Sequence, residues 1–390
     1  MGRDSLRTFI VASAALVSAA FARPAQAVEI GPSGAPGSVD IHGFVSQGAI
    51  LSTGNNYLAK SKRGSFELTE VGINFTVPLT DRLRAGLQLF SRDLGPIGNY
   101  VPRADWFYLD YRFADWLGFR AGRVKLPFGL YNDSSDADSA RVPILLPQST
   151  YPIQNRDFLL AQTGFEIYGR LDLRAAGALE YRHYVGTIFL DTSSQTSLTT
   201  RVEEIDIPYV AGERLVWETP IEGLRAAGSL QALRLDARFL HEGKPVDFEL
   251  PVVLWTGSLE YAAHDLLVAA EYGRWYGRYR SSDPALLPTG ETTNERAYLM
   301  TSYRVAPWFV PGAYYSLFFP DTRRREGRAN VQHDIAATLR FDLNAHWLLK
   351  LEGHFMSGTA GLSSALNSNR PLGELEPNWG VFLAKTTVYF

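Results

Sequence analysis

The chain has 390 residues, a formal net charge of −3, no cysteine and a mean hydropathy of only −0.10. The lack of cysteine excludes disulfide frameworks and thiolate metal sites, and the near balance of charge gives no support to nucleic-acid binding. A helical membrane protein would be far more apolar, whereas a membrane protein built from strands alternates its apolar residues with polar ones.

The N-terminus has the three parts of a secretory signal peptide. Arg3 and Arg7 precede an apolar run from about Phe9 to Phe21, and Ala25-Gln26-Ala27 follows as an A-x-A cleavage site. The run is shorter than the roughly 20 residues that a membrane helix needs. We therefore predict cleavage after Ala27 and an exported protein.

From Val39 onward, one pattern recurs along the chain. Two alternating stretches of about ten residues are joined by a very short turn, and a longer polar segment follows. This rhythm is typical of an up-and-down membrane barrel. We therefore divide the chain into a signal peptide over 1–27, a flexible lead-in rich in Gly and Pro over 28–38, and one transmembrane β-barrel over 39–390. The all-β barrel is predicted to have sixteen antiparallel strands, over 39–52, 65–78, 82–93, 103–113, 117–126, 162–172, 174–190, 212–220, 224–240, 247–262, 265–280, 294–305, 309–319, 331–343, 347–357 and 379–390.

The short turns carry the strongest signal. Each holds Asp, Asn, Pro or Gly, the residues that favour turns, and they are predicted at 79–82, 114–116, 171–173, 220–223, 263–265, 306–308 and 343–346. Trp116, Trp308 and Trp347 lie at or beside these turns, where a barrel has its interfacial belt of aromatic residues. With seven short turns among sixteen strands, the first strand begins and the last strand ends on the side of the short turns. Both termini are therefore predicted at the short-turn end.

The predicted strands have one apolar and one charged face. In the fifteenth strand, Leu351 and Phe355 face opposite to Lys350, Glu352 and His354. In a soluble sandwich the apolar face would point to the core and the charged face to water. In a membrane barrel the apolar face would meet lipid and the charged face would line the lumen. Alternation alone leaves both arrangements open.

The longest connection runs from about Pro127 to Ala161, after the fifth strand, and is the third of the long loops. Connections of this length without structure of their own are uncommon unless they are functional. Three acids, Asp133, Asp136 and Asp138, lie in it. They fit either a charged lining of a passage or a solvated loop turn with no role in selectivity.

The last stretch, Trp379–Phe390, reads as one strand that ends on an aromatic residue. A closed barrel pairs its final strand with its first, and a terminal aromatic ring then lies at the membrane interface. This strand resembles the assembly signal of the bacterial outer-membrane β-barrels, in which an aromatic or apolar residue stands at every second position. The resemblance implies that Phe390, Val388 and Phe382 are read by the barrel assembly machinery.

The position and polarity of the long loop resemble those of the trimeric porins, in which the third loop folds into the lumen and narrows it. In that family, acids of the loop face arginines on the opposing wall. The resemblance implies a pore constriction of loop acids and wall arginines, here Asp133, Asp136, Asp138, Arg84, Arg112, Arg120 and Arg340. The acidic loop motif of the best-known general porins is absent, so these residues are assigned by position alone.

The same resemblance implies a homotrimer in the outer membrane of a Gram-negative bacterium, with both termini in the periplasm. The expected partners are outer-membrane lipids and lipopolysaccharide, the barrel assembly machinery and small hydrophilic solutes, and no nucleic acid. Arg323-Arg324-Arg325, with Arg328, lies in the long loop after the thirteenth strand. This cluster fits contact with lipopolysaccharide phosphates or a solvated loop tip.

No catalytic motif is present. The seven histidines form neither H-E-x-x-H nor an i, i+4 pair, and the chain has no G-x-S-x-G and no P-loop. His354 shares its strand face with Lys350 and Glu352, which fits a pore-lining residue better than a metal ligand. We expect no enzyme activity, no metal and no cofactor.

The leading hypothesis for function is a passive channel for small hydrophilic solutes or ions. Such a pore would select by size at the third loop and by the charge of its lining. The first alternative is a substrate-selective channel, with an arginine ladder for phosphate or other anions, or an aromatic slide for sugars. The second is an outer-membrane barrel enzyme, such as a lipase or a protease. Arg and Tyr are both plentiful, so the sequence leaves the solute open.

Overall fold

A computed structural model describes residues 28–30, 35–189, 200–241, 243–286 and 288–390. The signal peptide predicted over 1–27 lies outside the described residues.

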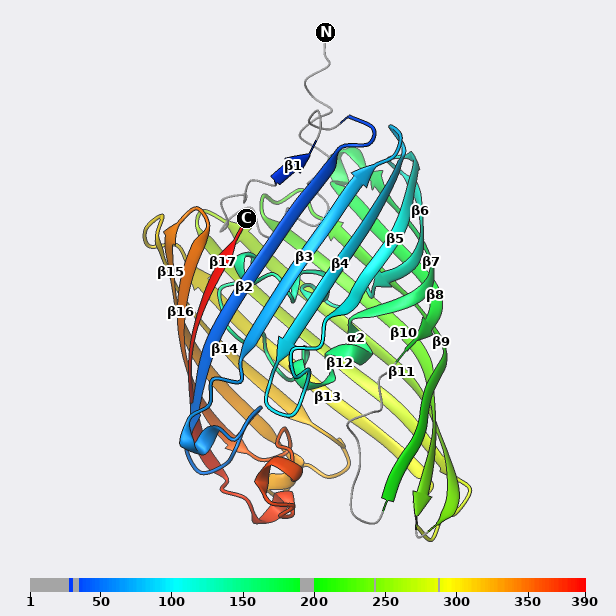
Figure 1. The fold of residues 1–390 in the computed structure, drawn as a ribbon, viewed down its shortest axis with the longest axis vertical. Helices are drawn as coiled ribbons and strands as arrows, with labels where there is room; N and C mark the ends of the chain where they lie inside the picture. Colours follow the sequence, from blue (N-terminus) through cyan, green and yellow to red (C-terminus); the bar gives the residue numbers. More distant parts are fainter. Residues whose placement is uncertain (1–27, 31–34, 190–199, 242, 287) are drawn as a thin grey trace.

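The described chain forms a closed antiparallel β-barrel, as predicted (Figure 1). Each of the strands β2 to β17 pairs with its neighbour, and β17 pairs with β2 to close the ring. The sixteen barrel strands are β2 (Val39–Ser52), β3 (Thr69–Pro78), β4 (Leu83–Asp93), β5 (Arg103–Ala114), β6 (Leu117–Lys125), β7 (Ala161–Asp172), β8 (Ala178–Ile188), β9 (Thr200–Glu218), β10 (Leu224–His241), β11 (Lys244–Ala263), β12 (Leu266–Ser281), β13 (Gly290–Tyr303), β14 (Phe309–Phe319), β15 (Gln332–Asn344), β16 (Trp347–Gly358) and β17 (Asn378–Tyr389).

Several strand boundaries shift by a few residues, as at β3 and β8, and two segments differ more from the prediction. The predicted lead-in contains a short strand, β1 (Val28–Ile30), which pairs with the start of β2. Strand β9 begins at Thr200 rather than at 212, because β10 pairs with it along its whole length. Pro208 lies where the pairing of the two strands shifts register, a place where proline costs no ladder hydrogen bond.

All the predicted short turns join neighbouring strands at one end of the barrel. One of them consists of His264 and Asp265, whose φ angles of 54° and 61° are those of a two-residue hairpin turn. The first barrel strand begins, and the last barrel strand ends, at this same end of the barrel. The Gly37 N–H donates to the Pro78 carbonyl beside the β3–β4 turn, and the Tyr389 N–H donates to the His346 carbonyl in the β15–β16 turn.

The two faces of the wall decide between the soluble and the membrane arrangement. In β16, Lys350, Glu352 and His354 are buried, whereas Phe355 is 57% exposed. A soluble sandwich would have the opposite distribution. Large apolar side chains are exposed around the barrel, including Val45, Leu109, Phe119, Phe165, Val185, Leu230, Leu259, Leu299, Ile335 and Phe382. A continuous apolar outer surface of this kind is what a barrel presents to lipid.

Aromatic side chains collect at the short-turn end of the outer surface. Trp116, Trp308 and Trp347 are all exposed, and the Trp308 ring stacks on Phe341 with the ring centroids 6.4 Å apart. This is the arrangement expected of an interfacial belt. In the described part of the chain, no helix is long and apolar enough to cross a membrane.

The helices of the described residues are short and lie in the connections. They are α2 (Arg156–Leu159) and the 3₁₀ turns η1 (Ser61–Arg63), η2 (Asn132–Ser134), η3 (Asp138–Ala140), η4 (Ile153–Asn155), η5 (Arg174–Ala176), η6 (Arg328–Asn330), η7 (Ala365–Asn367) and η8 (Leu372–Glu374). Four of them, η2, η3, η4 and α2, belong to the β6–β7 connection.

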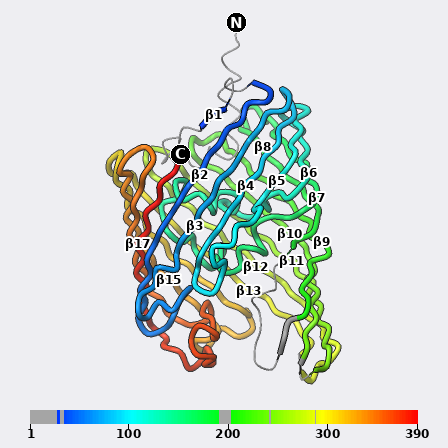
Figure 2. Tube along the Cα trace, in the orientation of Figure 1, coloured from blue at the N-terminus to red at the C-terminus, as the bar shows by residue number. Residues whose placement is uncertain are grey.

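The interior contains apolar clusters formed between loops and the inner wall. One cluster joins Leu130, Tyr131, Val142, Leu146 and Tyr151 of the β6–β7 connection to the inner face of β12–β15. A second joins Ile144 and Leu145 to residues of the β2–β3 and β16–β17 connections. Figure 2 shows the trace of the β6–β7 connection within the outline of the barrel. The third long loop is therefore held by packing as well as by the polar contacts described below.

Candidate pore constriction

The β6–β7 connection, residues 126–160, lies against the inner wall of the barrel. Its two ends are tied together by Asn132, whose side-chain amide donates to the carbonyls of Leu126 (2.8 Å) and Leu159 (2.5 Å). From this base, the loop contacts inward-facing side chains of β8, β9, β12, β13, β16 and β17. The loop thus reaches opposite sides of the lumen.

Asp133 binds two arginines of the wall. Its carboxylate lies 2.9 Å from Arg182 on β8 and 2.8 Å from Arg214 on β9. Burial alone would raise the pKa of Asp133, but the two guanidinium groups outweigh it and hold the pKa below the usual range of an aspartate. Asp133 is therefore a permanent negative charge at neutral pH, and it is shared by two cations.

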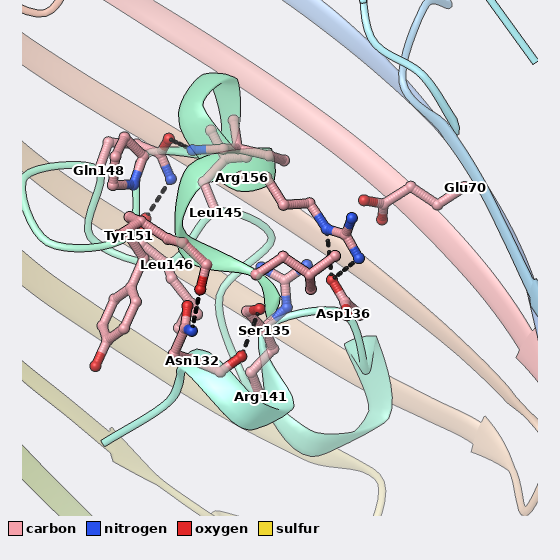
Figure 3. A pocket seen from close by; sticks show the side chains of 14 residues that line it. Glu70, Asn132, Ser135, Asp136, Arg141, Leu145, Leu146, Gln148, Tyr151 and Arg156 are labelled. Atoms are coloured by element: carbon pink, nitrogen blue, oxygen red, sulfur yellow. Dashed lines mark hydrogen bonds and ion pairs between the residues drawn. The ribbon is translucent and has the colours of Figure 1, made fainter. Parts of the chain in front are cut away.

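Asp136 is paired within the loop and its stem, and Figure 3 shows its contact with Arg156. Lys125 lies 3.0 Å from this carboxylate, and Arg156 lies 2.7 Å from it. Arg156 also forms a two-pronged contact with Asp105 on β5, at 2.8 and 2.7 Å. Burial would raise the pKa of Asp136, but Arg156 and Lys125 lower it below its usual range.

Asp138 connects the loop to the far side of the barrel. Lys385 on β17 lies 2.8 Å from its carboxylate, and Lys350 on β16 lies 3.6 Å from it. Arg141 of the loop approaches to 3.0 Å, and the Thr387 hydroxyl donates to the same carboxylate at 2.7 Å. Burial would raise the pKa of Asp138, but the lysines and the arginine hold it well below its usual range.

Two of the predicted wall arginines join a chain of alternating charges. Asp110 on β5 lies 2.6 Å from Arg84 and 3.2 Å from Arg120, and Arg120 lies 2.8 Å from Glu166 on β7. Glu166 in turn pairs with Arg182 at 2.6 Å. The porin resemblance implied that Arg84 and Arg120 face the loop acids. Neither arginine pairs with a loop acid directly; both belong to the network that reaches Asp133.

The other two predicted arginines occupy different places. Arg112 lies near the short-turn end, 3.8 Å from Asp115, and not beside the three loop acids. Arg340 pairs with Asp342 at 2.8 Å and donates to the carbonyls of Ser139 and Arg141 at 2.8 and 3.1 Å. Arg340 therefore contacts the backbone of the loop and not its acids.

Sequence reasoning did not find several residues that hold the loop. Glu352 on β16 accepts the backbone N–H groups of Ile144 and Leu145, at 2.7 and 2.9 Å. Glu271 on β12 accepts the Leu130 N–H at 2.9 Å and the hydroxyl of Tyr151. Their position on the charged face of a strand was a visible signal. Their partners were not, because those lie more than a hundred residues away in the chain.

A cavity of about 190 Å³ lies between the loop and the wall towards the short-turn end. Its lining joins wall residues of β2, β3, β4 and β17 to loop residues, among them Asn74, Gln88, Asp136, Asp138 and Thr387. Two of the predicted loop acids therefore line open space, while Asp133 lies on the side of β8 and β9.

The three predicted assembly residues lie along the closing seam. Phe390 exchanges two backbone hydrogen bonds with Gly43 of β2, at 3.0 and 3.1 Å. Its ring covers Gly43 so closely that a Cβ atom there would lie 2.7 Å from the ring. Phe382 and Val388 are half-exposed and pair with Leu51 and Val45 across the seam.

The apolar outer surface, the charged inner wall and the inserted loop define a class, the transmembrane up-and-down β-barrels of sixteen strands. A scan against protein-family models finds no match, and a search of curated proteins finds none either. Similar solved structures exist.

The fold is similar to an anion-selective porin from Comamonas acidovorans, with 14% identity, a TM-score of 0.54, and coverage of 90% of this chain and 99% of that chain. It is also similar to OmpF of Salmonella typhi in complex with daunomycin, with 12% identity, a TM-score of 0.58, and coverage of 93% and 100%. The trimer form of OmpT, an outer membrane protein of Vibrio cholerae, has 10% identity, a TM-score of 0.59, and coverage of 91% and 100%. At these identities the likeness establishes the fold.

Proposed function

We propose that this protein is a porin of the Gram-negative outer membrane, which lets small hydrophilic solutes or ions diffuse passively through its lumen. The observation that carries the proposal is the loop of residues 126–160, whose acids are held between cations on opposite sides of a charged inner wall. A loop fixed in this way narrows the passage without a moving part. It selects solutes by size.

The charges of the wall would add an electrostatic bias. The network from Arg84 to Arg214 contains four arginines but only three acids, Asp110, Glu166 and Asp133. In a narrow passage with low-dielectric walls, a local excess of one sign acts more strongly than in bulk water. This row of arginines favours the anion-selective channel as the second candidate function.

The remaining expectations belong to the same proposal. Both termini would lie in the periplasm, because the barrel's first and last strands end at the short-turn end. A homotrimer is consistent with a porin, and the trimer form of OmpT has a similar fold.

On the rim opposite the short turns, Arg323 pairs with Asp321 and Arg325 with Glu295, while Arg324 is exposed. We propose that this rim contacts lipopolysaccharide phosphates, and that the assembly machinery reads the closing strand.

We propose no enzyme activity. A barrel hydrolase needs a histidine, or an acid, beside a nucleophile. His354 is buried with both ring nitrogens beside carboxylates, 2.9 Å from Asp334 and 3.0 Å from Glu352. Among the described residues, no group of His, Asp and Glu has the arrangement of a metal site. These observations favour a structural role for His354 over a catalytic one.

Liposome swelling tests the passive channel directly. Vesicles that contain the refolded protein should swell in isotonic solutions of small sugars, and the rate should fall steeply as the sugar grows. Vesicles with a heat-denatured sample are the control. Hydrolysis of the vesicle lipid, or of an added peptide, without any swelling would favour the enzyme over the porin.

A further inference from the structure

An arginine of the inner wall is buried without an anionic partner. Arg296 on β13 is 8% exposed. Its guanidinium group donates to the Ser149 carbonyl of the loop at 2.5 Å and to the Asn294 side chain at 3.1 Å. In the described part of the chain no carboxylate forms an ion pair with it, whereas Arg120 and Arg182 each contact two carboxylates.

Aromatic rings hold this guanidinium group in place. Its central carbon lies 3.7 Å from the centre of the Trp275 ring and 4.8 Å from the centre of the Phe318 ring. Trp275 pairs with Asn294 across β12 and β13, and Arg296 pairs with Gly273, so the tryptophan and the arginine share the inward face of neighbouring strands. The rings cover the guanidinium group and leave its edges for hydrogen bonds.

Two buried donors in this stack have no acceptor. They are the Arg296 Nε–H and the indole Nε1–H of Trp275. A buried donor without a partner is costly, and an unpaired buried charge more so. The buried cation and the neighbouring unpaired indole N–H both favour an acceptor that is negatively charged. A planar fork of N–H groups matches the oxygens of a carboxylate or a phosphate.

We propose that Arg296 and Trp275 form a binding site for a small oxyanion, a phosphate or a carboxylate group, on the inner wall beside Ser149. The site lies outside the predicted constriction residues. It does not depend on conduction, because an anion that binds there is detected in the folded barrel whether or not solutes pass through it. Failure of the porin proposal and failure of this one are therefore distinguishable.

The test measures inorganic phosphate binding to the full-length folded protein in detergent. Phosphate replaces chloride at constant ionic strength, and binding is followed by calorimetry and by tryptophan fluorescence. We expect saturable binding with a change in fluorescence. Arg296→Gln should weaken the binding about tenfold or more, the usual effect of losing a charged hydrogen-bond donor. Trp275→Phe keeps an aromatic face but removes the Nε1 donor, so it should weaken binding and abolish the fluorescence change.

The matched control is Arg274→Gln. Arg274 lies beside Trp275 in the chain but pairs with Glu295 on the outer face, so phosphate binding should be unchanged. If Arg296→Gln does not fold, as judged by its heat-modified mobility, Arg296→Lys serves instead, because it keeps the charge but lacks the Nε donor. A parallel titration with acetate separates the two ligand groups, since binding of acetate alone assigns a carboxylate. No saturable binding of either anion, or binding equal to wild type in a folded Arg296 variant, would overturn the proposal.

Discussion

At the scale of single residues, the closing seam depends on a contact between the two ends of the barrel. Gly43 has no side chain, and this gives room for the Phe390 ring while the two residues exchange backbone hydrogen bonds. A larger residue at position 43 would occupy the same space as the ring. Phe390 thus continues the strand ladder across the closing seam.

We predict that deletion of Phe390 lowers the amount of folded protein in the outer membrane more than it lowers the heat stability of the protein that does fold. Gly43→Val should have a milder effect, because it displaces the ring but keeps the aromatic terminus. Gly353→Ala is the control, since a Cβ atom there meets nothing within 4 Å. Immunoblots of membrane fractions measure the level, and a normal level of the deletion variant would refute the assembly role.

Asp133 gives a prediction about pH. The pKa of its carboxyl is lower in the folded barrel than the usual value of about 3.9 in an unfolded chain. The ionised group therefore adds stability above that pH, and this stability is lost as the pH falls through the folded pKa. Asp133→Asn should be less stable than wild type at neutral pH, by up to about 3 kcal/mol, because Arg182 and Arg214 lose their charged partner.

The difference between Asp133→Asn and wild type should shrink in acid. The measurement is the midpoint temperature of heat-induced unfolding at about pH 7 and at about pH 2. Asp115→Asn is the control, because the Asp115 side chain is 91% exposed in a short turn. A stability difference for Asp133→Asn that stays constant over this range would show that the ion pairs of Asp133 do not hold the loop.

At the scale of the element, the third loop crosses the lumen and is bound to the wall on both sides. Asp133 binds the β8–β9 wall, and Asp138 binds the β16–β17 wall, while Leu130 and Tyr151 pack on β12–β15. The strands themselves pair only with their neighbours in the ring. The hydrogen bonding between the barrel strands therefore does not depend on the middle of the loop.

We predict that deletion of 134–154 raises the conductance of a single channel and leaves a folded barrel. The reason is that the deletion removes the part of the loop that crosses to β16 and β17. Deletion of 323–325, on the rim between β14 and β15, is the matched control and should change the conductance little. An unchanged conductance in a folded 134–154 variant would move the constriction from the loop to the wall.

Asp133, Asp136 and Asp138 neutralise cations of the wall and the loop, among them Arg182, Arg214, Lys125, Arg156 and Lys385. Replacing all three acids with Asn should leave these cations uncompensated and shift the channel towards anions. The reversal potential in a salt gradient measures the shift, with Asp115→Asn as the control. A shift towards cations, or none, would show that the three acids do not set the field in the passage.

At the scale of the whole molecule, local patterns predicted the fold and long-range contacts did not. Alternation with a period of two and the turn residues located the sixteen strands and the short turns, because both signals arise from neighbours in sequence. Strand β9 was predicted too short, since its first half carries acids and Pro208 and takes its strand form from β10. Pairing at a distance overrode local propensity there.

The sequence predicted where the candidate constriction lies, but not which residues pair with one another in it. The length and acidity of the third loop pointed to Asp133, Asp136 and Asp138, and strand faces pointed to charged inner positions. The partner of each acid depends on which strand lies across the lumen, and one sequence does not contain that information. Lys385, for example, is more than two hundred residues from Asp138 but lies 2.8 Å from it.

Recordings in a planar lipid bilayer test whether the barrel is an open channel that the third loop constricts. Refolded wild-type protein should insert in discrete steps of uniform conductance, and the same steps should become larger in the folded 134–154 deletion. A salt gradient should give a non-zero reversal potential that moves towards anion selectivity in the variant without the three loop acids. A folded, membrane-inserted barrel that shows no conductance in either wild type or the loop deletion would show that the protein is not an open channel.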